Sequence, residues 1–292
     1  TRSKKLGCVC YETLLAGGVK DKDSLIWAKS IAGQFGALKK DKGNPLNELE
    51  IEQLVHVSVT EQAAIDSLVK LMVSEHREAT EQELELLRQD NHSTDIALFG
   101  RMLASKPSFN VEAACQVAHA ISVHSVVIED DYFTAVDDLN DKSVDAGAAH
   151  IGETGFAAGL FYSYVCINRQ QLIDNLSGDE RLAEKAIQAL TEAAVKVAPA
   201  GKQNSFGSRA YASYVMAESG DQQPRSLSVA FLKPIDQRSS DDFASDSITA
   251  LERQQEYFDE TYGTCAEHRC VINAIAPGGS TLNDLLTFVA SD

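Results

Sequence analysis

The sequence predicts an α+β protein, and three features of its 292 residues support that fold class. Up to about residue 90, apolar side chains recur at the three-to-four spacing of helices. From about residue 94 onward, β-branched and aromatic runs of strand length alternate with helical segments. A third stretch, residues 130–155, is acidic and rich in small residues. With 44% hydrophobic content, the chain can bury one sizeable core and a smaller appended lobe.

The N-terminal region predicts two buried helices and an exposed one. Residues 25–38 place their apolar side chains along one stripe. A second helix begins after Ser58, which stands in a capping-box relation to Glu61. Its expected buried face consists of Ile65, Leu68, Val69 and Met72. Residues 80–89 predict a third helix that is charged on most sides.

Strands and helices are expected to alternate after residue 94. Residues 111–120 predict a helix that leads into a β-branched strand at 121–127. Residues 155–169 alternate larger and smaller side chains and predict a central strand covered on both faces. The clearest helix spans residues 181–197, which are rich in strong helix formers.

Two strand-like runs and a last helix follow. The runs are residues 209–216 and 227–232, and the helix spans residues 247–262 with Asp246 as its cap. This order of elements is typical of a ferredoxin-like sheet with helices on one face. Residues 130–155 are too long for a turn and too poor in core residues for an element, so they predict a protruding hairpin or arm.

Charge is unevenly distributed along the chain. The formal net charge of −17 argues at first sight against a nucleic-acid partner. Residues 1–42, however, hold nine Lys and Arg against four Asp and Glu, so they carry about +5 and the remainder about −22. A solvated helical face and a phosphate-binding surface both remain open from charge alone.

Composition also bears on the cellular setting. No stretch approaches the roughly 20 apolar residues of a membrane span. Six scattered cysteines do not suggest a disulfide framework. We therefore expect a soluble, cytoplasmic protein that does not bind membranes.

Two groups of side chains could supply metal ligands. The first is His119, His124, Asp130 and Asp131, and the second is Cys265, His268 and Cys270. The five-residue separation of the two histidines does not stack them on a helix, and the cysteine group has no fourth ligand nearby. We expect structural roles for both groups, and neither a metal site nor a cofactor. Nucleophile elbows and phosphate-binding glycine loops are also missing from the sequence, so we expect no catalytic residues.

A short polar loop at residues 201–204 could hold phosphates. Gly201 lets the backbone approach a phosphate, Lys202 supplies charge, and the amides of the next two residues can donate hydrogen bonds. A plain turn from helix to strand is an equally good interpretation.

Several ordered segments together resemble the CasC family, the backbone subunit of the type I-E CRISPR complex Cascade. They are DIALFGRM at 95–102, VAHAISVH at 117–124, YFTAVDDL at 132–139, GLFYSYVCIN at 159–168, NRQQLIDNL at 168–176 and PAGKQNSF at 199–206. The resemblance covers residues 94–234 closely, and the preceding helical region in pattern only. Family members carry a strand, a basic segment and a first helix ahead of the TRSKKL at residues 1–6, so we expect further RNA contacts there.

The resemblance implies a ferredoxin-like or RRM-like palm at residues 94–292, with helical fingers at 1–93 and a thumb hairpin at about 130–155. It implies that copies of the chain polymerise along the guide RNA (crRNA), kink it at regular intervals, and present it for pairing with a target DNA strand in antiviral defence. Other Cascade subunits are further expected partners. The protein itself would not be an enzyme.

The resemblance also assigns roles to individual residues. Met102, Phe133 and Thr134 would form an apolar wedge at the kink, while the loop after Gly201 would hold phosphates. The full expected RNA-binding set is Arg2, Lys4, Lys5, Arg101, Met102, Phe133, Thr134, Lys202, Gln203 and Asn204.

Two alternatives remain open at the level of sequence. One is a metal-dependent ribonuclease, as in the backbone subunits of type III effectors, with Asp95, Asp130 and Asp131 as candidate residues. The other is an acidic protein-interaction module without a role in RNA binding.

Overall fold

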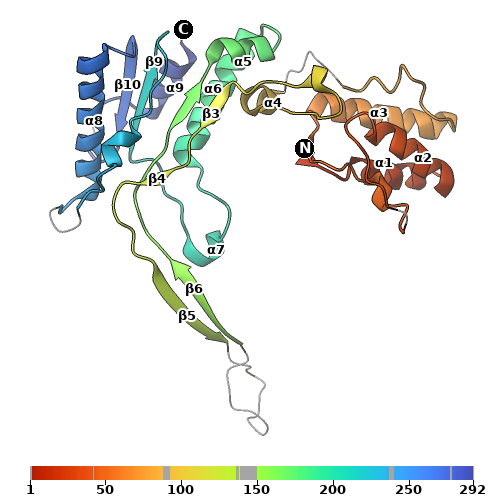
Figure 1. Ribbon diagram of the computed structural model, residues 1–292, viewed down its shortest axis with the longest axis horizontal. Helices are drawn as coiled ribbons and strands as arrows, with labels where there is room; N and C mark the ends of the chain where they lie inside the picture. Colours follow the sequence, from red (N-terminus) through yellow and green to blue (C-terminus); the bar gives the residue numbers. More distant parts are fainter. Residues whose placement is uncertain are drawn as a thin grey trace. The chain divides into compact units, whose positions relative to one another are not determined.

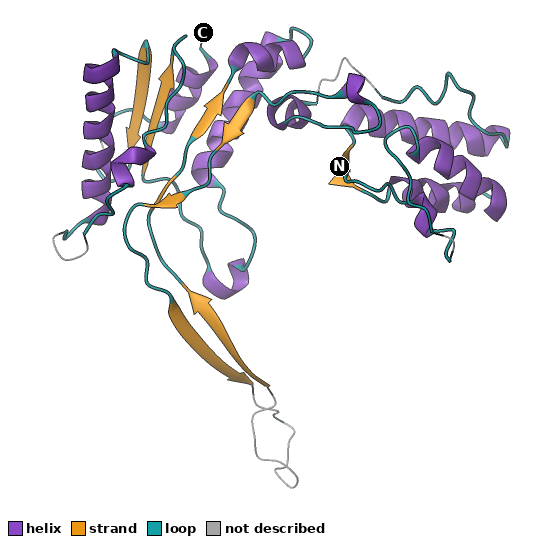
Figure 2. Ribbon diagram, in the orientation of Figure 1, coloured by secondary structure: helices purple, strands orange, loops and turns teal. Residues whose placement is uncertain are grey.

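The computed structural model describes residues 2–41, 43–87, 93–135, 138, 150–236, 240–276 and 278–291. The predicted mixture of helices and strands is confirmed (Figures 1 and 2). Contacts divide the chain into two compact units. Unit 1 comprises residues 1–116 and 165–190, and unit 2 comprises residues 117–164 and 191–292. These limits differ from the expected boundary at residue 94.

Unit 1 is built around three helices that share one core. They are α1 (Leu6–Ala16), α2 (Asp21–Ala32) and α3 (Val59–Glu75), accompanied by the short pair β1 (Arg2–Ser3) and β2 (Val55–His56) and the 3-10 turn η1 (Asn47–Leu49). The fully buried side chains of this core include Leu14, Ile31, Phe35, Leu49, Ile51, Ile65 and Met72.

The predicted start and buried face of α3 are confirmed. Ser58 Oγ accepts a hydrogen bond from the Glu61 amide at 3.1 Å, and a Glu61 carboxylate oxygen accepts one from the Ser58 amide at 2.9 Å. This capping box satisfies two amides that have no partner within the helix. All four residues expected on the apolar face are buried.

The helix predicted at residues 80–89 is wrong over its described part. Residues 81–84 form a turn instead, and residues 88–89 lie outside the described chain. Both Arg77 and Thr80 donate hydrogen bonds to the Glu83 carboxylate. These contacts tie the segment into a compact loop, which explains why its charged sequence does not continue as a helix.

This loop leads to a pH-dependence prediction. Hydrogen bonds from Arg77 and then Thr80 lower the pKa of Glu83 to about 2. The ordinary pKa of Glu is ~4.3, so the stability that Glu83 contributes is fully present above that pH and is lost as the pH falls toward the folded value. Thermal unfolding of wild type and Glu83→Gln, measured between pH 6 and 2 (the range set by these two values), should therefore converge at the acid end. Glu81→Gln, at an exposed neighbour, is the control, and curves that stay parallel would contradict the assignment.

The described residues of the remaining part of unit 1 form two paired strands and three helices. These are α4 (Thr94–Phe99), β3 (Cys115–Val117), β8 (Val165–Ile167), α5 (Arg169–Asn175) and α6 (Glu180–Lys196), with the 3-10 turn η2 (Pro107–Phe109). The last residues of β3 and α6 belong to unit 2. The prediction for α6 is confirmed, and it buries Ala183, Ala186 and Ile187.

The helix predicted at residues 111–120 is wrong. Within this segment, β3 pairs with β8, and the Asn168 amide donates to the Ala114 carbonyl at 2.8 Å. The alanines favour a helix locally, but pairing with a strand about fifty residues further on satisfies the same backbone groups, and tertiary context overrides a weak propensity.

The described residues of unit 2 include short antiparallel strand pairs, one long helix and a small core. Strands β4 (Ile121–Ser122) and β7 (Phe161–Tyr162) pair, as do β9 (Tyr214–Ser219) and β10 (His268–Asn273), in both cases antiparallel. The unit also contains α7 (Gln203–Phe206), the 3-10 turn η3 (Ser228–Phe231), α8 (Phe243–Tyr262) and α9 (Leu282–Ala290). Its core is formed by Val123, Leu227, Phe231 and Leu251.

Several predictions for this part of the chain need correction. The single central strand at 155–169 is divided among β6, β7 and β8, and Phe161 is 60% exposed. Residues 228–231 form a 3-10 turn and no strand. The cap of α8 is Asp242 and not Asp246, since Asp242 accepts from the amides of the first turn. Among the described strands every sheet has two members, so the ferredoxin-like order does not appear there as one continuous sheet.

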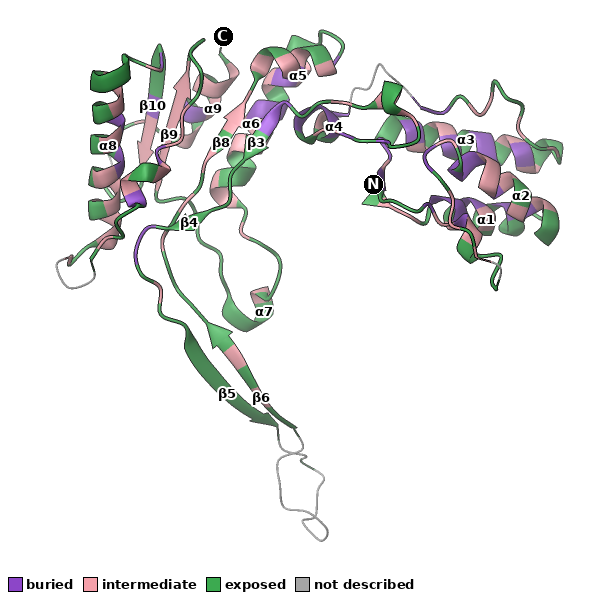
Figure 3. Ribbon diagram, in the orientation of Figure 1, coloured by how far each residue is buried: buried purple, intermediate pink, exposed green. Residues whose placement is uncertain are grey.

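The segment expected to form an arm contains a β-hairpin. Strand β5 (Glu129–Ala135) pairs antiparallel with β6 (His150–Phe156) over seven residues, from Glu129 opposite Phe156 to Ala135 opposite His150. Both strands are largely exposed (Figure 3): every residue of β5 is exposed, whereas Gly152 and Thr154 of β6 are half-buried. Residues 136–137 and 139–149 lie outside the described chain. Among described residues, no helix has both the length and the apolar character needed to cross a membrane.

Candidate nucleic-acid interface

The hairpin presents different side chains on its two faces. Successive residues of a strand point to opposite faces, so Phe133 and Thr134 do not lie on the same side. Phe133 shares its face with its cross-strand partner Gly152 and is 44% exposed. Its ring lies 5.8 Å from that of His150 between centroids. Thr134 lies on the other face with its partner Ile151, so Phe133 and Thr134 do not contribute to one contact surface.

The polar loop at residues 201–204 lies close to one end of the hairpin and belongs to the same unit. Phe206 of α7 contacts Phe156 at the end of β6, with ring centroids 5.5 Å apart. Lys202 precedes α7 in the left-handed backbone region (φ 58°) and is exposed. The aromatic contact therefore holds an exposed cation near the strand that pairs with Phe133.

The two amides of the loop have different surroundings. Gln203 Nε2 donates to the carbonyls of Pro199 and Ser208, so this amide closes the loop on itself and is not free to bind phosphate. These hydrogen bonds favour a structural role for Gln203 over the expected RNA contact. Asn204 is exposed, as expected of a phosphate contact.

Met102 is presented by a tightly held loop of unit 1. It is 76% exposed, whereas its neighbours Arg101 and Leu103 are buried. The amides and carbonyls of Arg101 and Val111 exchange two hydrogen bonds of 2.9 Å. Gly100 adopts φ 77°, and a Cβ there would lie 2.9 Å from the Val111 carbonyl oxygen, so the close approach requires glycine.

Arg101 is held in a buried ion pair. Arg101 Nη1 donates to both carboxylate oxygens of Glu61, at 2.9 and 2.7 Å, and to the His56 carbonyl at 3.3 Å. The two side chains of this ion pair are 1% and 0% exposed. A guanidinium that is buried and paired to this extent does not face solvent, so we expect a structural role for Arg101 in place of the predicted RNA contact.

The N-terminal cations are distributed between ion pairs and solvent. Lys29 pairs with Glu48 and Lys39 pairs with Glu50. Of the predicted contacts, Arg2 and Lys5 are exposed and Lys4 is half-buried. All three belong to unit 1, as Met102 does.

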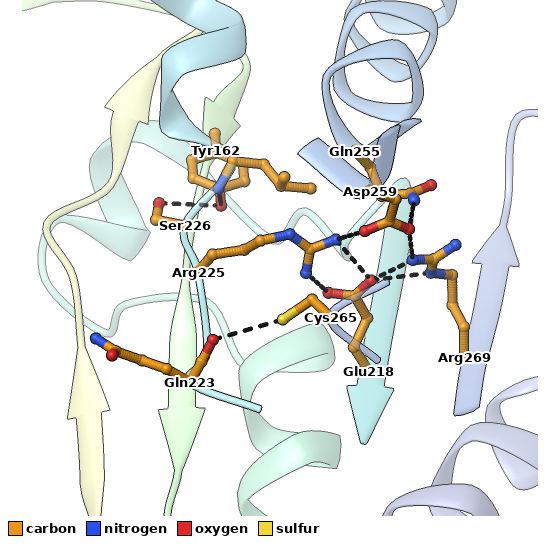
Figure 4. A network of polar contacts seen from close by, with 10 residues as sticks. Tyr162, Glu218, Gln223, Arg225, Ser226, Gln255, Asp259, Cys265 and Arg269 are labelled. Carbon is orange, nitrogen blue, oxygen red and sulfur yellow. Dashed lines mark hydrogen bonds and ion pairs between the residues drawn. The ribbon is translucent and has the colours of Figure 1, made fainter. Parts of the chain in front are cut away.

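Neither candidate metal cluster assembles in the part of the chain that the structure describes. No three side chains of His, Cys, Asp and Glu come together there as a metal site. His124 contacts the Ser125 carbonyl through Nδ1 at 2.7 Å and accepts from the Leu160 amide through Nε2 at 3.1 Å, so both nitrogens have structural partners. Cys265 donates to the Gln223 carbonyl at 3.5 Å (Figure 4), whereas Cys270 is buried on β10.

Asp95, a candidate of the ribonuclease alternative, is occupied by protein contacts. It lies 2.7 Å from His56 Nε2 and also accepts a hydrogen bond from Ser93. Burial acts to raise the pKa of Asp95, but the Ser93 hydrogen bond and the His56 charge outweigh it and hold that pKa below its usual value. Asp130 and Asp131, the other two candidates, are exposed on β5.

Comparison with known proteins finds a similar fold in chains of CRISPR RNA-guided surveillance complexes. The fold matches a chain of a pre-nicking CRISPR RNA-guided surveillance complex with a TM-score of 0.81 and 24% identity, over 99% of this chain and 83% of that one. A chain of another CRISPR RNA-guided surveillance complex matches with a TM-score of 0.59 and 27% identity, over 81% of this chain and 85% of that one. No curated protein sequence matches. The model of the CT1975-like protein family matches residues 1–285, and the chain therefore belongs to this family.

Proposed function

We propose that this protein is a non-catalytic backbone subunit that binds the guide RNA of a CRISPR surveillance complex. The observation that carries the proposal is the placement of exposed Phe133 and exposed Lys202 in one unit, joined through the Phe156–Phe206 contact. An aromatic ring and a nearby cation are the two groups that bind single-stranded RNA without reading its sequence. The structural relatives, which are chains of CRISPR RNA-guided surveillance complexes, support this assignment.

In the proposed mechanism the protein holds the RNA, and the RNA bases provide the specificity. Lys202 and Asn204 contact phosphates, while Phe133 and Met102 contact bases and interrupt their stacking at regular intervals. The bases in between remain available to pair with a target DNA strand, so specificity comes from base pairing and not from protein side chains. Copies of the chain polymerise along the RNA and also contact other subunits of a Cascade-type complex in the cytoplasm.

The finer family assignment is also part of this proposal. We assign the chain to the CasC type of type I-E systems, with the β5–β6 hairpin as its thumb, the helices α1–α3 as its fingers, and an RRM-like palm in the remainder. Among the candidates of the ribonuclease alternative, Asp95 is held by His56 and Ser93, whereas Asp130 and Asp131 are exposed.

Salt-dependent RNA binding tests this function. Lys202→Ala should reduce the salt dependence of guide-RNA binding by about one phosphate contact per copy, because counterion release scales with the phosphates neutralised. Met102→Ala should instead weaken binding about fivefold at every salt concentration, since a base contact is worth ~1 kcal/mol and carries no charge. The measurement is fluorescence anisotropy of labelled guide RNA at several salt concentrations.

Arg253→Ala, at an exposed cation on α8, is the matched control for the lost charge. RNA binding that is unchanged in both test variants would favour the protein-interaction alternative. Cleavage of complementary RNA in the presence of Mg²⁺ by the assembled complex would favour the ribonuclease alternative.

A further inference from the structure

The ring of Phe133 lies directly over a glycine on the opposite strand. Phe133 and Gly152 are cross-strand partners in the hairpin. A Cβ built on Gly152 would lie 2.5 Å from Phe133 Cζ, 2.9 Å from Cε1 and 3.2 Å from Cε2. The far edge of the ring therefore occupies the space that any other residue at position 152 would fill.

Backbone conformation does not explain this glycine. The described residues with positive φ do not include Gly152, which sits within a regular ladder. Glycine within a strand weakens it, and it is typical of places where another group approaches the backbone closely. The group that approaches Gly152 is the Phe133 ring.

Two neighbours fix the ring from different directions. Gly152 leaves room for it against the opposite strand, and His150 contacts it with centroids 5.8 Å apart. The far edge of the ring lies against Gly152, while Phe133 as a whole remains 44% exposed. A ring covered on one side can stack against a single base, whereas a ring that inserts between two bases needs both faces free.

We propose that Gly152 is a positioning residue that holds Phe133 as a one-sided stacking platform for a guide-RNA base. This inference rests on the proposed function and adds the geometry of the base contact. A side chain at position 152 lifts the ring off the hairpin and removes its defined orientation. Base stacking on an aromatic side chain depends on parallel planes, so the lifted ring binds the base more weakly.

The test uses complexes assembled on guide RNAs that carry 2-aminopurine at successive positions. The fluorescence of this base rises where stacking on neighbouring bases is interrupted, so wild type should give maxima at regular intervals. Gly152→Ala should lower these fluorescence maxima by roughly half and weaken RNA binding roughly threefold, which is a fraction of one full base–aromatic contact. Phe133→Ala should abolish most of the height of the maxima.

Gly155→Ala is the matched control, because it adds the same methyl group to the same strand. Its Cβ would meet only Ile128 Cγ2, at an ordinary 3.4 Å, so the fluorescence pattern should match wild type. In a Phe133→Ala background, Gly152→Ala should have no further effect, since no ring remains to be displaced. Far-UV circular dichroism and thermal unfolding of each variant show that the fold is retained.

The outcomes distinguish the positioning role of Gly152 from the proposed RNA-binding function. If Phe133→Ala alters the pattern but Gly152→Ala does not, the positioning role is overturned and the proposed function stands. An equal effect of Gly155→Ala, or a persistent effect of Gly152→Ala without the ring, also overturns it. If Phe133→Ala leaves the fluorescence pattern unchanged, both the proposed base contact of Phe133 and the positioning role of Gly152 are contradicted.

Discussion

Replacing Arg101 with alanine is expected to lower the free energy of unfolding by about 3–5 kcal/mol, the usual cost of removing one partner of a buried ion pair. The Glu61 carboxylate would remain fully buried with its charge uncompensated. Glu61 also completes the capping box of α3, so its displacement would disturb the start of that helix. Chemical denaturation at neutral pH measures the change.

The same variant distinguishes a structural role from an RNA contact. Arg101→Ala protein that remains folded at low temperature should bind guide RNA with the same salt dependence as wild type, because no phosphate contact is lost. The double variant Arg101→Met with Glu61→Gln should recover part of the lost stability, since it leaves no unpaired buried charge and keeps a side chain able to cap. A reduced salt dependence together with normal stability would contradict the structural role.

The orientations of the Arg101 and Met102 side chains could not be predicted from the sequence. Both were expected to contact RNA, but the chain buries the first and exposes the second. The two residues lie outside regular helices and strands, so no periodicity indicates which side chain points inward. Their orientation follows from the bridge to Val111 and from the ion pair with Glu61, forty residues earlier in the chain.

Features with local causes were predicted well. The capping box of Ser58 and Glu61 lies within four consecutive residues, and the apolar stripe of α3 follows from helical spacing. The length and composition of residues 130–155 pointed to an arm, and β5 and β6 pair in that segment. The register of the hairpin places Phe133 opposite Gly152. It depends on how the two strands pair, and the alternation of side chains within one strand does not predict it.

Ion pairing also changes how the charge of this chain is understood. Arg77, Arg101, Arg225 and Arg269 all pair with carboxylates of the chain itself. Composition counts these side chains as cations that could meet a polyanion, but their charges are already matched. An RNA-binding surface built from few cations, such as Lys202, is therefore consistent with a net charge of −17.

Glu218→Ala is expected to destabilise unit 2 by about 2–3 kcal/mol, the scale of charge-assisted hydrogen bonds at partly buried sites. Glu218 accepts from Arg225 at 2.8 Å and also from Arg269, and both guanidiniums contact Asp259 as well (Figure 4). Without Glu218, two cations face a single carboxylate. Because this cluster links β9 and β10 to α8, its loss should lower the unfolding midpoint in urea.

Acid titration tests the contribution of Asp259 to the same cluster. Burial acts to raise the pKa of Asp259, but the Arg269 hydrogen bond and the charge of Arg225 outweigh it and keep the pKa below its usual ~3.9. The stabilisation that Asp259 contributes is thus present above that pH and is lost as the pH falls through the lower folded value, so wild type should approach an Asp259→Asn variant in acid. Glu256→Ala, at an exposed carboxylate of the same helix, should change stability by less than about 0.5 kcal/mol. Equal effects of the two substitutions would show that general charge balance, and not this cluster, holds α8 against the sheet.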